Sequence, residues 1–222
     1  MAGTKKSSLR VIMLVAATAI VASAIVSGSY EISFERIQKN QQERELATLD
    51  ELLKASNYDE VIESSNSAKN TNIARSLEPF PIYLAIQNGS PTAVVFSVGS
   101  SQGYNGPIYM LVGIDIHGNI TGVRITSHRE TPGLGDQIEI EKSDWITNFN
   151  QKNIFNSPLS SWKVTKDGGQ FDGFTSATIT ARAVIYSVRD TLAYFEKNKT
   201  DLITQPVFST LKTEISDLEP NQ

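Results

Sequence analysis

The feature that most constrains this 222-residue chain is the point where a Thr- and Ser-rich segment, residues 171–182, leads into an amphipathic helix. Beyond residue 181, large apolar side chains recur at spacings near 3.6 residues, at Val184, Val188, Leu192 and Phe195. Thr180 is a suitable N-cap, so we predict a helix over about 181–198. Thr178 would then lie just outside the helix N-terminus, where backbone amides and the helix dipole favour a negative group.

The segment that contains Thr178 has a distinctive spacing of residue types. It reads Asp-Gly-Phe-Thr-Ser-Ala-Thr over residues 172–178. This resembles the flavinylation signature Asp-x-x-(Ser/Thr)-Gly-Ala-Thr of FMN-binding domains, in which the last threonine is linked to FMN through the cofactor's phosphate. Ser176 stands where that family usually has glycine, which puts the local backbone geometry and recognition by a transferase in question. Taken alone, the segment also fits an ordinary helix cap.

Two upstream segments extend the resemblance. Residues 103–108 read Gly-Tyr-Asn-Gly-Pro-Ile, and residues 130–135 read Glu-Thr-Pro-Gly-Leu-Gly. Both are similar to segments of the same domain in the G subunit of the Rnf electron-transport complex and in the C subunit of the sodium-pumping NADH:quinone reductase. With all three segments in order, the chain resembles the family of Rnf G subunits. The sodium-pumping reductase family is the near alternative, and the compact chain and residues 103–108 favour the Rnf branch.

The resemblance implies FMN bound covalently by a phosphoester to Thr178. The loop at 130–135 is then expected to line the isoalloxazine pocket with Glu130, Thr131, Gly133 and Leu134. Its proline and glycines favour a fixed, closely approaching loop, and a Pro-Gly turn without a ligand is the alternative. Beside the attachment point, the signature contributes Asp172, Thr175, Ser176 and Ala177.

Other candidate site residues each have a structural alternative. Tyr104 and Trp145 would stack on the flavin or lie at its edge, or else pack in the core or at the rim. Lys163 and Arg182 would pair with the phosphate, or else be solvated surface charges. Asp172 would serve transferase recognition or metal handling, or else be a solvated acid in a turn.

The chain lacks the groups that would attach a flavin to its own threonine. A threonine hydroxyl is a poor nucleophile at neutral pH, and no Ser-His-Asp or similar arrangement that would activate it is evident. A separate flavin transferase is therefore implied, and the resemblance suggests a magnesium-dependent enzyme that moves FMN from FAD. We predict no catalytic residue in the chain itself.

Composition narrows the remaining classes. With two histidines and no cysteines, a metal site is not expected, and disulfides and thiolate-bound clusters are excluded. Redox chemistry therefore needs an organic cofactor or a partner. A net charge of -4 and a pI near 5.3 give no basic footprint for nucleic acid.

The N-terminus has a basic tip followed by an uncharged apolar run. Lys5, Lys6 and Arg10 precede residues 11–26, which carry no charge. Over residues 9–28, about 20 residues at ~1.5 Å rise would span ~30 Å, enough to cross a hydrocarbon core. We predict a single-pass anchor in a bacterial inner (cytoplasmic) membrane, with the basic tip inside and the main domain on the periplasmic side. A signal peptide cleaved after the small residues at 22–24 is the alternative.

The predicted organisation has four parts: 1–28 as cytoplasmic tip and transmembrane anchor, 29–78 as helical stalk and loop, 79–200 as FMN-binding domain, and 201–222 as C-terminal tail. The stalk is expected to be helical over about 30–65, because leucines at 46, 49, 52 and 53 form an apolar stripe without Gly or Pro. Residues 66–78 are predicted as a loop. The fold class is α+β, an N-terminal transmembrane helix followed by one domain with a small antiparallel sheet and flanking helices.

Within the domain, alternating apolar residues and turn formers predict two hairpins. Their strands are expected over 80–86 and 93–98, and over 108–114 and 120–127. A helix is expected over 139–149, with Trp145, Ile146 and Phe149 on one face, and a further short strand over 160–165.

The resulting hypothesis is a membrane-anchored electron carrier that works with the other membrane and redox subunits of an Rnf-type complex. The flavin would supply the redox chemistry, and the chain would not turn over a substrate alone. No dinucleotide-binding G-x-G-x-x-G fingerprint is present at a strand-to-helix turn. The alternative is a non-redox, anchored interaction domain in which Thr178 is unmodified.

Overall fold

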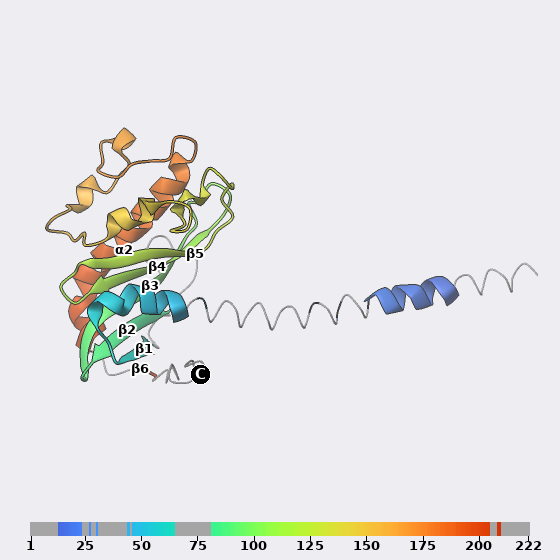
Figure 1. Cartoon of the computed structure of the whole chain (residues 1–222), viewed down its shortest axis with the longest axis horizontal. Helices are drawn as coiled ribbons and strands as arrows, with labels where there is room; N and C mark the ends of the chain where they lie inside the picture. Colours follow the sequence, from blue (N-terminus) through green and yellow to red (C-terminus); the bar gives the residue numbers. More distant parts are fainter. Residues whose placement is uncertain are drawn as a thin grey trace, which may run out of the picture. The chain divides into compact units, whose positions relative to one another are not determined.

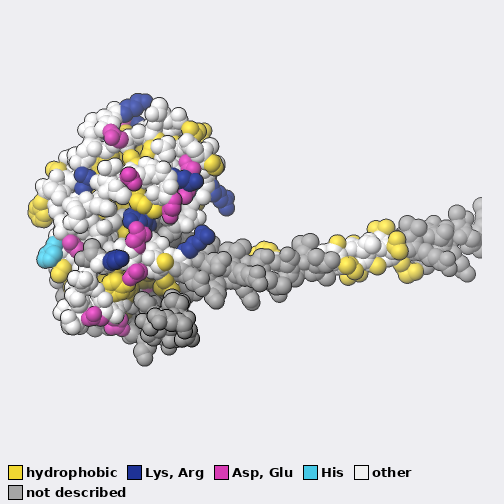
Figure 2. Space-filling model, viewed as in Figure 1, with side chains coloured by type: hydrophobic (Ala, Val, Ile, Leu, Met, Phe, Trp, Pro, Cys, Tyr) yellow, Lys and Arg dark blue, Asp and Glu magenta, His cyan; other side chains and the backbone are white. Residues whose placement is uncertain are grey.

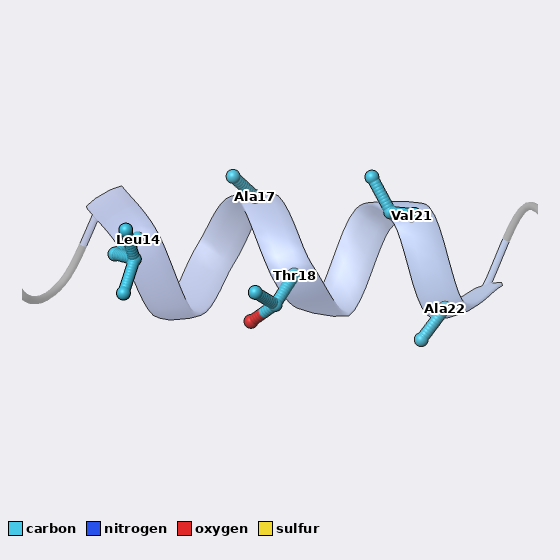
Figure 3. Close-up of a pocket in the computed structure, with 5 residues that line it drawn as sticks. All are labelled: Leu14, Ala17, Thr18, Val21 and Ala22. Atoms are coloured by element: carbon cyan, nitrogen blue, oxygen red, sulfur yellow. The ribbon is translucent and has the colours of Figure 1, made fainter.

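A computed structural model of the chain describes residues 13–23, 27, 30, 44, 46–64, 81–204 and 208–209. The chain divides into two compact units, Met1–Ala47 and Thr48–Gln222. In the first unit, residues 13–23 form a helix whose side chains are exposed. Figure 3 shows five of them, Leu14, Ala17, Thr18, Val21 and Ala22, which line a shallow groove on this helix.

The apolar run near the N-terminus is described only in part. Among the residues that the structure describes, no helix combines the length and the apolar character that a bilayer span requires. The ends of the apolar run, at 11–12 and 24–26, and the predicted loop at 66–78 lie outside the described residues.

The second unit is built on an antiparallel sheet, as predicted. Six strands are arranged in the order β5-β4-β3-β2-β1-β6 (Figure 1). Their bounds are β1 (Glu60–Ser64), β2 (Ile82–Gln87), β3 (Ser90–Ser100), β4 (Ile108–Asp115), β5 (Ile120–Ser127) and β6 (Phe208–Ser209). The two predicted hairpins are β2–β3 and β4–β5. The short strand β6 brings the C-terminal segment back to pair with β1, with Ser64 opposite Phe208.

One face of the sheet is covered by the long helix α2 (Thr178–Thr204), which packs on β3 and β4 (Figure 1). The apolar stripe predicted for this helix is buried against the sheet, and none of its members is exposed by more than 1% of its surface: Val184, Val188, Leu192 and Phe195. Alternation along the strands directs Phe96, Met110 and Val112 to the same core. This core fixes α2, and therefore its N-terminus, relative to the sheet.

The opposite face of the sheet is covered by the helical residues 48–53. Leu49, Leu52 and Leu53 are buried there against side chains of β2, β3 and β4. Leu52 lies over a cross-strand pair of glycines, Gly113 and Gly122, and a Cβ atom at Gly122 would come within 2.7 Å of its Cδ2 atom. The short helix is therefore part of the domain core, which begins well before residue 79.

Elsewhere on this unit, the visible surface intersperses acidic and basic side chains (Figure 2). One pair links the short helix to the sheet, because Arg124 contacts Glu51 with an N–O distance of 2.5 Å.

Three predicted elements differ in the structure. The stalk helix was predicted to about residue 65, but residues 60–64 form β1, because the helix ends in the short 3-10 helix η1 (Lys54–Ser56) followed by Asn57 at a φ of 42°. Asparagine tolerates this left-handed conformation, and the β-branched residues that follow pair with β2. Tertiary pairing thus overrides a segment that lacks Gly and Pro.

The helix predicted over 139–149 is reduced to the 3-10 helix η4 (Asp144–Phe149). Ser143 caps it by accepting a hydrogen bond from the Trp145 amide at 3.1 Å. The expected common face is correct, since Trp145, Ile146 and Phe149 are buried. The strand predicted over 160–165 is absent. This stretch instead forms two 3-10 helices, η5 (Leu159–Ser161) and η6 (Thr165–Asp167). Between them, Val164 makes a single β-bridge with Phe171.

Candidate functional site

The helix α2 begins at Thr178, three residues before the predicted start. Thr178 is therefore the first helical residue, and its half-buried hydroxyl donates a hydrogen bond to the Phe174 carbonyl at 3.1 Å. Thr180 does not act as the N-cap, because its buried hydroxyl donates to the carboxylate of Glu130. The prediction that Thr178 lies at the N-terminal end of the helix holds, but its placement outside the helix was wrong.

Ser176, which stands where the family signature has glycine, does not adopt the left-handed backbone conformation that favours glycine. Ser176 is not among the residues other than glycine with positive φ, which are Asn57, Asn88 and Gln151 in the described part of the chain. Thr175 and Ser176 form an exposed turn, and Ala177 is half-buried. A side chain at position 176 therefore fits the local conformation without strain.

The predicted flavin loop follows β5 by three residues and forms a turn that is exposed over residues 131–134. The amides of Leu134 and Gly135 donate to the Thr131 carbonyl at 3.1 and 3.0 Å. Gly133 has a φ of 77°, which glycine adopts readily, and a Cβ atom there would meet nothing within 4 Å. Thr131 and Gly133 are exposed, and Leu134 is 42% exposed for an apolar side chain. The turn thus offers an open, partly apolar surface.

Glu130 differs from the rest of this loop because it is buried, with 5% of its surface exposed. One carboxylate oxygen accepts from the Asn105 amide at 3.0 Å, and the other accepts from the Thr180 hydroxyl. Glu130 therefore joins the segment at 103–106, the loop at 130–135 and the first turn of α2. Two of the segments that carry the resemblance thus meet at the first turn of α2, and the third segment ends where that helix begins.

The two aromatic candidates occupy different environments. Tyr104 is 69% exposed and precedes Asn105, whose backbone amide is hydrogen-bonded to Glu130. Trp145 is 7% exposed and packs on Phe149 and Phe174, with ring centroids 5.5 and 4.8 Å away. Its indole N–H donates to the Asp172 carbonyl at 2.6 Å. Trp145 therefore holds the start of the signature segment from within the core, while the Asp172 side chain is exposed.

The two basic candidates lie near an acidic residue. Arg182 donates to both carboxylate oxygens of Asp167 at 2.6 and 2.8 Å. This hydrogen bonding is the main cause that lowers the pKa of Asp167, and the charges of Arg182, Lys166 and Lys163 lower it further. The same hydrogen bond raises the pKa of Arg182. Lys163 is exposed and, with Arg182, makes this a locally basic region around one carboxylate.

The contacts of several residues that shape the site were not predicted from sequence. Thr180 and Asn105 are joined to Glu130 across 50 and 25 residues of sequence. His128 accepts from the Glu130 amide at 3.0 Å through Nδ1, which leaves Nε2 to donate to Glu139 at 2.7 Å. No local sequence pattern marks such long-range pairs. Within the described ranges, no group of three or more His, Cys, Asp or Glu residues is arranged to hold a metal ion.

The residues present fit FMN. Open space at Gly133 and the exposed Leu134 provide a surface for a flat aromatic ring, and the Thr178 hydroxyl lies at the start of a 27-residue helix. The amides and dipole of a helix N-terminus favour a phosphate at that position.

Comparisons with known proteins match the part of the chain that holds these segments. A family model described as "FMN-binding domain" matches residues 103–193, which include all three segments. The G subunit of the ion-translocating oxidoreductase complex of Shewanella loihica is 38% identical over 203 residues, covering 91% of this chain and 96% of that protein. The proteins of the same name from Vibrio cholerae and Aliivibrio fischeri are 36% and 38% identical over 194 and 204 residues, covering 87% and 91% of this chain and 93% and 95% of theirs. By this similarity along nearly its whole length, the chain belongs to the family of G subunits of ion-translocating oxidoreductase complexes.

Proposed function

We propose that this protein is the membrane-anchored electron-carrier subunit of an Rnf-type ion-translocating oxidoreductase complex, with FMN linked by a phosphoester to Thr178. The observation that carries the proposal is that Glu130 joins residues 103–106 and the loop at 130–135 to the first turn of α2, which begins at Thr178, in a chain of the G-subunit family. The flavin, once bound, supplies transfer of electrons singly or in pairs. The protein supplies attachment, position and surroundings.

Attachment would make one bond and break one. The Thr178 oxygen forms a bond to the FMN phosphorus of FAD, the pyrophosphate P–O bond breaks, AMP leaves, and the hydroxyl proton passes to the transferase or to solvent. In the structure this hydroxyl donates to the Phe174 carbonyl, which is not a base that could activate it. A separate flavin transferase is therefore part of the proposal, and the exposed Asp172, Thr175 and Ser176 offer it an accessible recognition segment.

Around the attached cofactor, the residues divide by exposure. We assign the exposed Tyr104, Thr131 and Leu134, together with Gly133, to contact with the ring. Arg182 and Lys163 would draw the phosphate by charge, with Arg182 sharing its guanidinium between the phosphate and Asp167. Trp145 and Ala177 would support the signature segment from the protein side.

The location follows from the N-terminal sequence. We propose a single-pass anchor within residues 1–28 in the lipid bilayer of the bacterial inner membrane, with the domain on the periplasmic side. Its partners would be the other membrane and redox subunits of the complex. Intact mass of the purified protein tests the anchor against the signal-peptide alternative, because cleavage would give a new N-terminus near Ile25.

A denaturing gel tests the proposed attachment. Full-length protein made together with the flavin transferase should show a flavin fluorescence band, and Thr178→Val should abolish it. Thr165→Val is the matched control, since Thr165 is exposed at η6 outside the signature, and it should keep the band. A band that persists in Thr178→Val would place the attachment elsewhere.

Two alternatives are separated by observation. The C subunit of the sodium-pumping reductase is less favoured, because the relatives described above are all named as the G subunit of an ion-translocating oxidoreductase complex. A non-redox interaction domain would give an unmodified Thr178 even in cells that contain the partners and the transferase. Peptide mapping of protein from such cells distinguishes that case.

A further inference from the structure

The carboxylate of Glu130 is buried, and both of its oxygens accept hydrogen bonds from the protein. Its two oxygens accept from the Asn105 amide and the Thr180 hydroxyl, and Thr180 itself has no exposed surface. A buried carboxylate is retained at low cost only when its oxygens are paired in this way. Glu130 therefore differs from Thr131 and Leu134, which follow it closely in sequence and are exposed.

Two glycines leave room for this carboxylate and for little else. A Cβ atom at Gly103 would lie 2.8 Å from Glu130 Oε1. A Cβ atom at Gly135 would lie 2.8 Å from Glu130 Cβ and 3.3 Å from the Thr180 hydroxyl oxygen. Both distances of 2.8 Å are too short for real side chains, so the segments on either side close on Glu130 at van der Waals contact.

Each segment that Glu130 joins carries a residue assigned to the cofactor. Asn105 follows Tyr104, Glu130 precedes Thr131, and Thr180 lies two positions after Thr178 in the same helical turn. A second hydrogen bond strengthens the first junction, since the Asn105 side-chain amide donates to the Arg129 carbonyl at 2.7 Å. The relative positions of ring-binding and phosphate-binding residues therefore depend on contacts made by one carboxylate.

We propose that Glu130 and Thr180 form a positioning pair that sets the attachment threonine relative to the flavin-binding turn, and that neither side chain contacts the flavin. The inference rests on the proposed attachment at Thr178. The pair acts by geometry and by charge. It fixes the start of α2 against the 130–135 loop, and it keeps a negative charge beside the flavin site, which disfavours the addition of electrons to the cofactor.

The experiment uses the full-length protein, made with the transferase and purified in detergent. Thr180→Val is nearly isosteric and removes only the hydroxyl donor, whereas Thr180→Ser keeps it. The first variant should carry covalent flavin but show a changed visible circular dichroism of the flavin and a shifted midpoint potential, or should lose flavinylation. The serine variant should match the wild type in each of these readouts.

The charge part is tested with Glu130→Gln. The neutral amide cannot accept from both donors, and loss of the negative charge should move the flavin midpoint potential to more positive values. Wild-type potential and dichroism in both Glu130→Gln and Thr180→Val, at full flavin content, would overturn the proposal. The same conclusion would follow if Thr180→Ser behaved like Thr180→Val.

A measurement without flavin covers variants that fail to be loaded. In apo protein, Glu130→Ala removes the acceptor of the Asn105 amide, and hydrogen exchange in peptides covering residues 103–107 should accelerate about tenfold or more. Unchanged exchange in these peptides would contradict the proposed role of Glu130 in holding residues 103–107, even if no flavin is ever attached. Failure of the attachment proposal shows separately, as a missing wild-type band or a band that survives in Thr178→Val.

Discussion

Replacement of Leu52 by alanine tests whether the short helix at 48–53 is part of the domain. Leu52 is 2% exposed and lies over Gly113 and Gly122, whose lack of side chains creates the space that it fills. Strand backbone cannot move into the space that the substitution leaves. Large-to-small substitutions of buried leucine cost about 2–5 kcal/mol, and a rigid floor places this one at roughly 3 kcal/mol or more.

Urea unfolding of the flavin-free protein measures this cost. With a urea dependence of about 1–3 kcal/mol per molar, a loss of ~3 kcal/mol lowers the midpoint by roughly 1–3 M. Leu46→Ala is the matched control on the same stretch, because Leu46 is 39% exposed, and it should change the free energy of unfolding by about 0.5 kcal/mol or less. Equal midpoints for the two variants would show that the short helix does not pack on the sheet in solution.

Three further changes have defined outcomes. Arg182→Met should raise the pKa of Asp167 toward its ordinary value, which carboxyl NMR would measure. Because that pKa is lowered in the folded state, the ion pair stabilises the protein at pH values above the ordinary carboxyl pKa. This stabilisation is lost as the pH falls through the lowered value. Asp50→Asn should lower the pKa of Tyr58, which phenolate absorbance would measure. The decrease should be partial, since burial of the phenol is the larger cause of the raised pKa. The contribution of Tyr58 to stability is present below the ordinary phenol pKa and is lost as the pH rises through the raised value. Trp145→Phe should cost about 1–2 kcal/mol in urea unfolding, because it leaves a backbone carbonyl of the signature segment without its indole donor, and an unchanged midpoint would contradict that role.

The elements that sequence predicted well are those governed by local periodicity. Strands β2 to β5 alternate apolar residues and are joined by strong turn formers, and α2 carries a regular apolar stripe. The start of α2 was misplaced because Thr180 resembles an N-cap, whereas its hydroxyl bonds to a carboxylate 50 residues earlier. Strand β1 was missed because its pairing partner lies about 20 residues away, beyond any local pattern.

For the candidate site, the sequence motifs marked the segments but not the orientation of their side chains. The motifs located Thr178 and the turn at 130–135, because their spacing is visible in the sequence. The motifs did not distinguish Glu130, which is buried, from its neighbour Thr131, which is exposed. Distant segments that pack against a motif determine which of its side chains are buried and which are exposed. The sequence of the motif itself does not contain this information.

The pairing of β6 with β1 has a consequence for which edges of the sheet are available to partners. The polypeptide enters the sheet at β1 and leaves it at β6, side by side at one edge, whereas the turn at 130–135 extends from β5 at the opposite edge. From β1 to β5 there are four strand spacings, roughly 19 Å at ~4.8 Å each. The edge at which the chain enters and leaves the sheet is thus separate from the edge that carries the exposed turn at 130–135, to which we assign contact with the flavin ring.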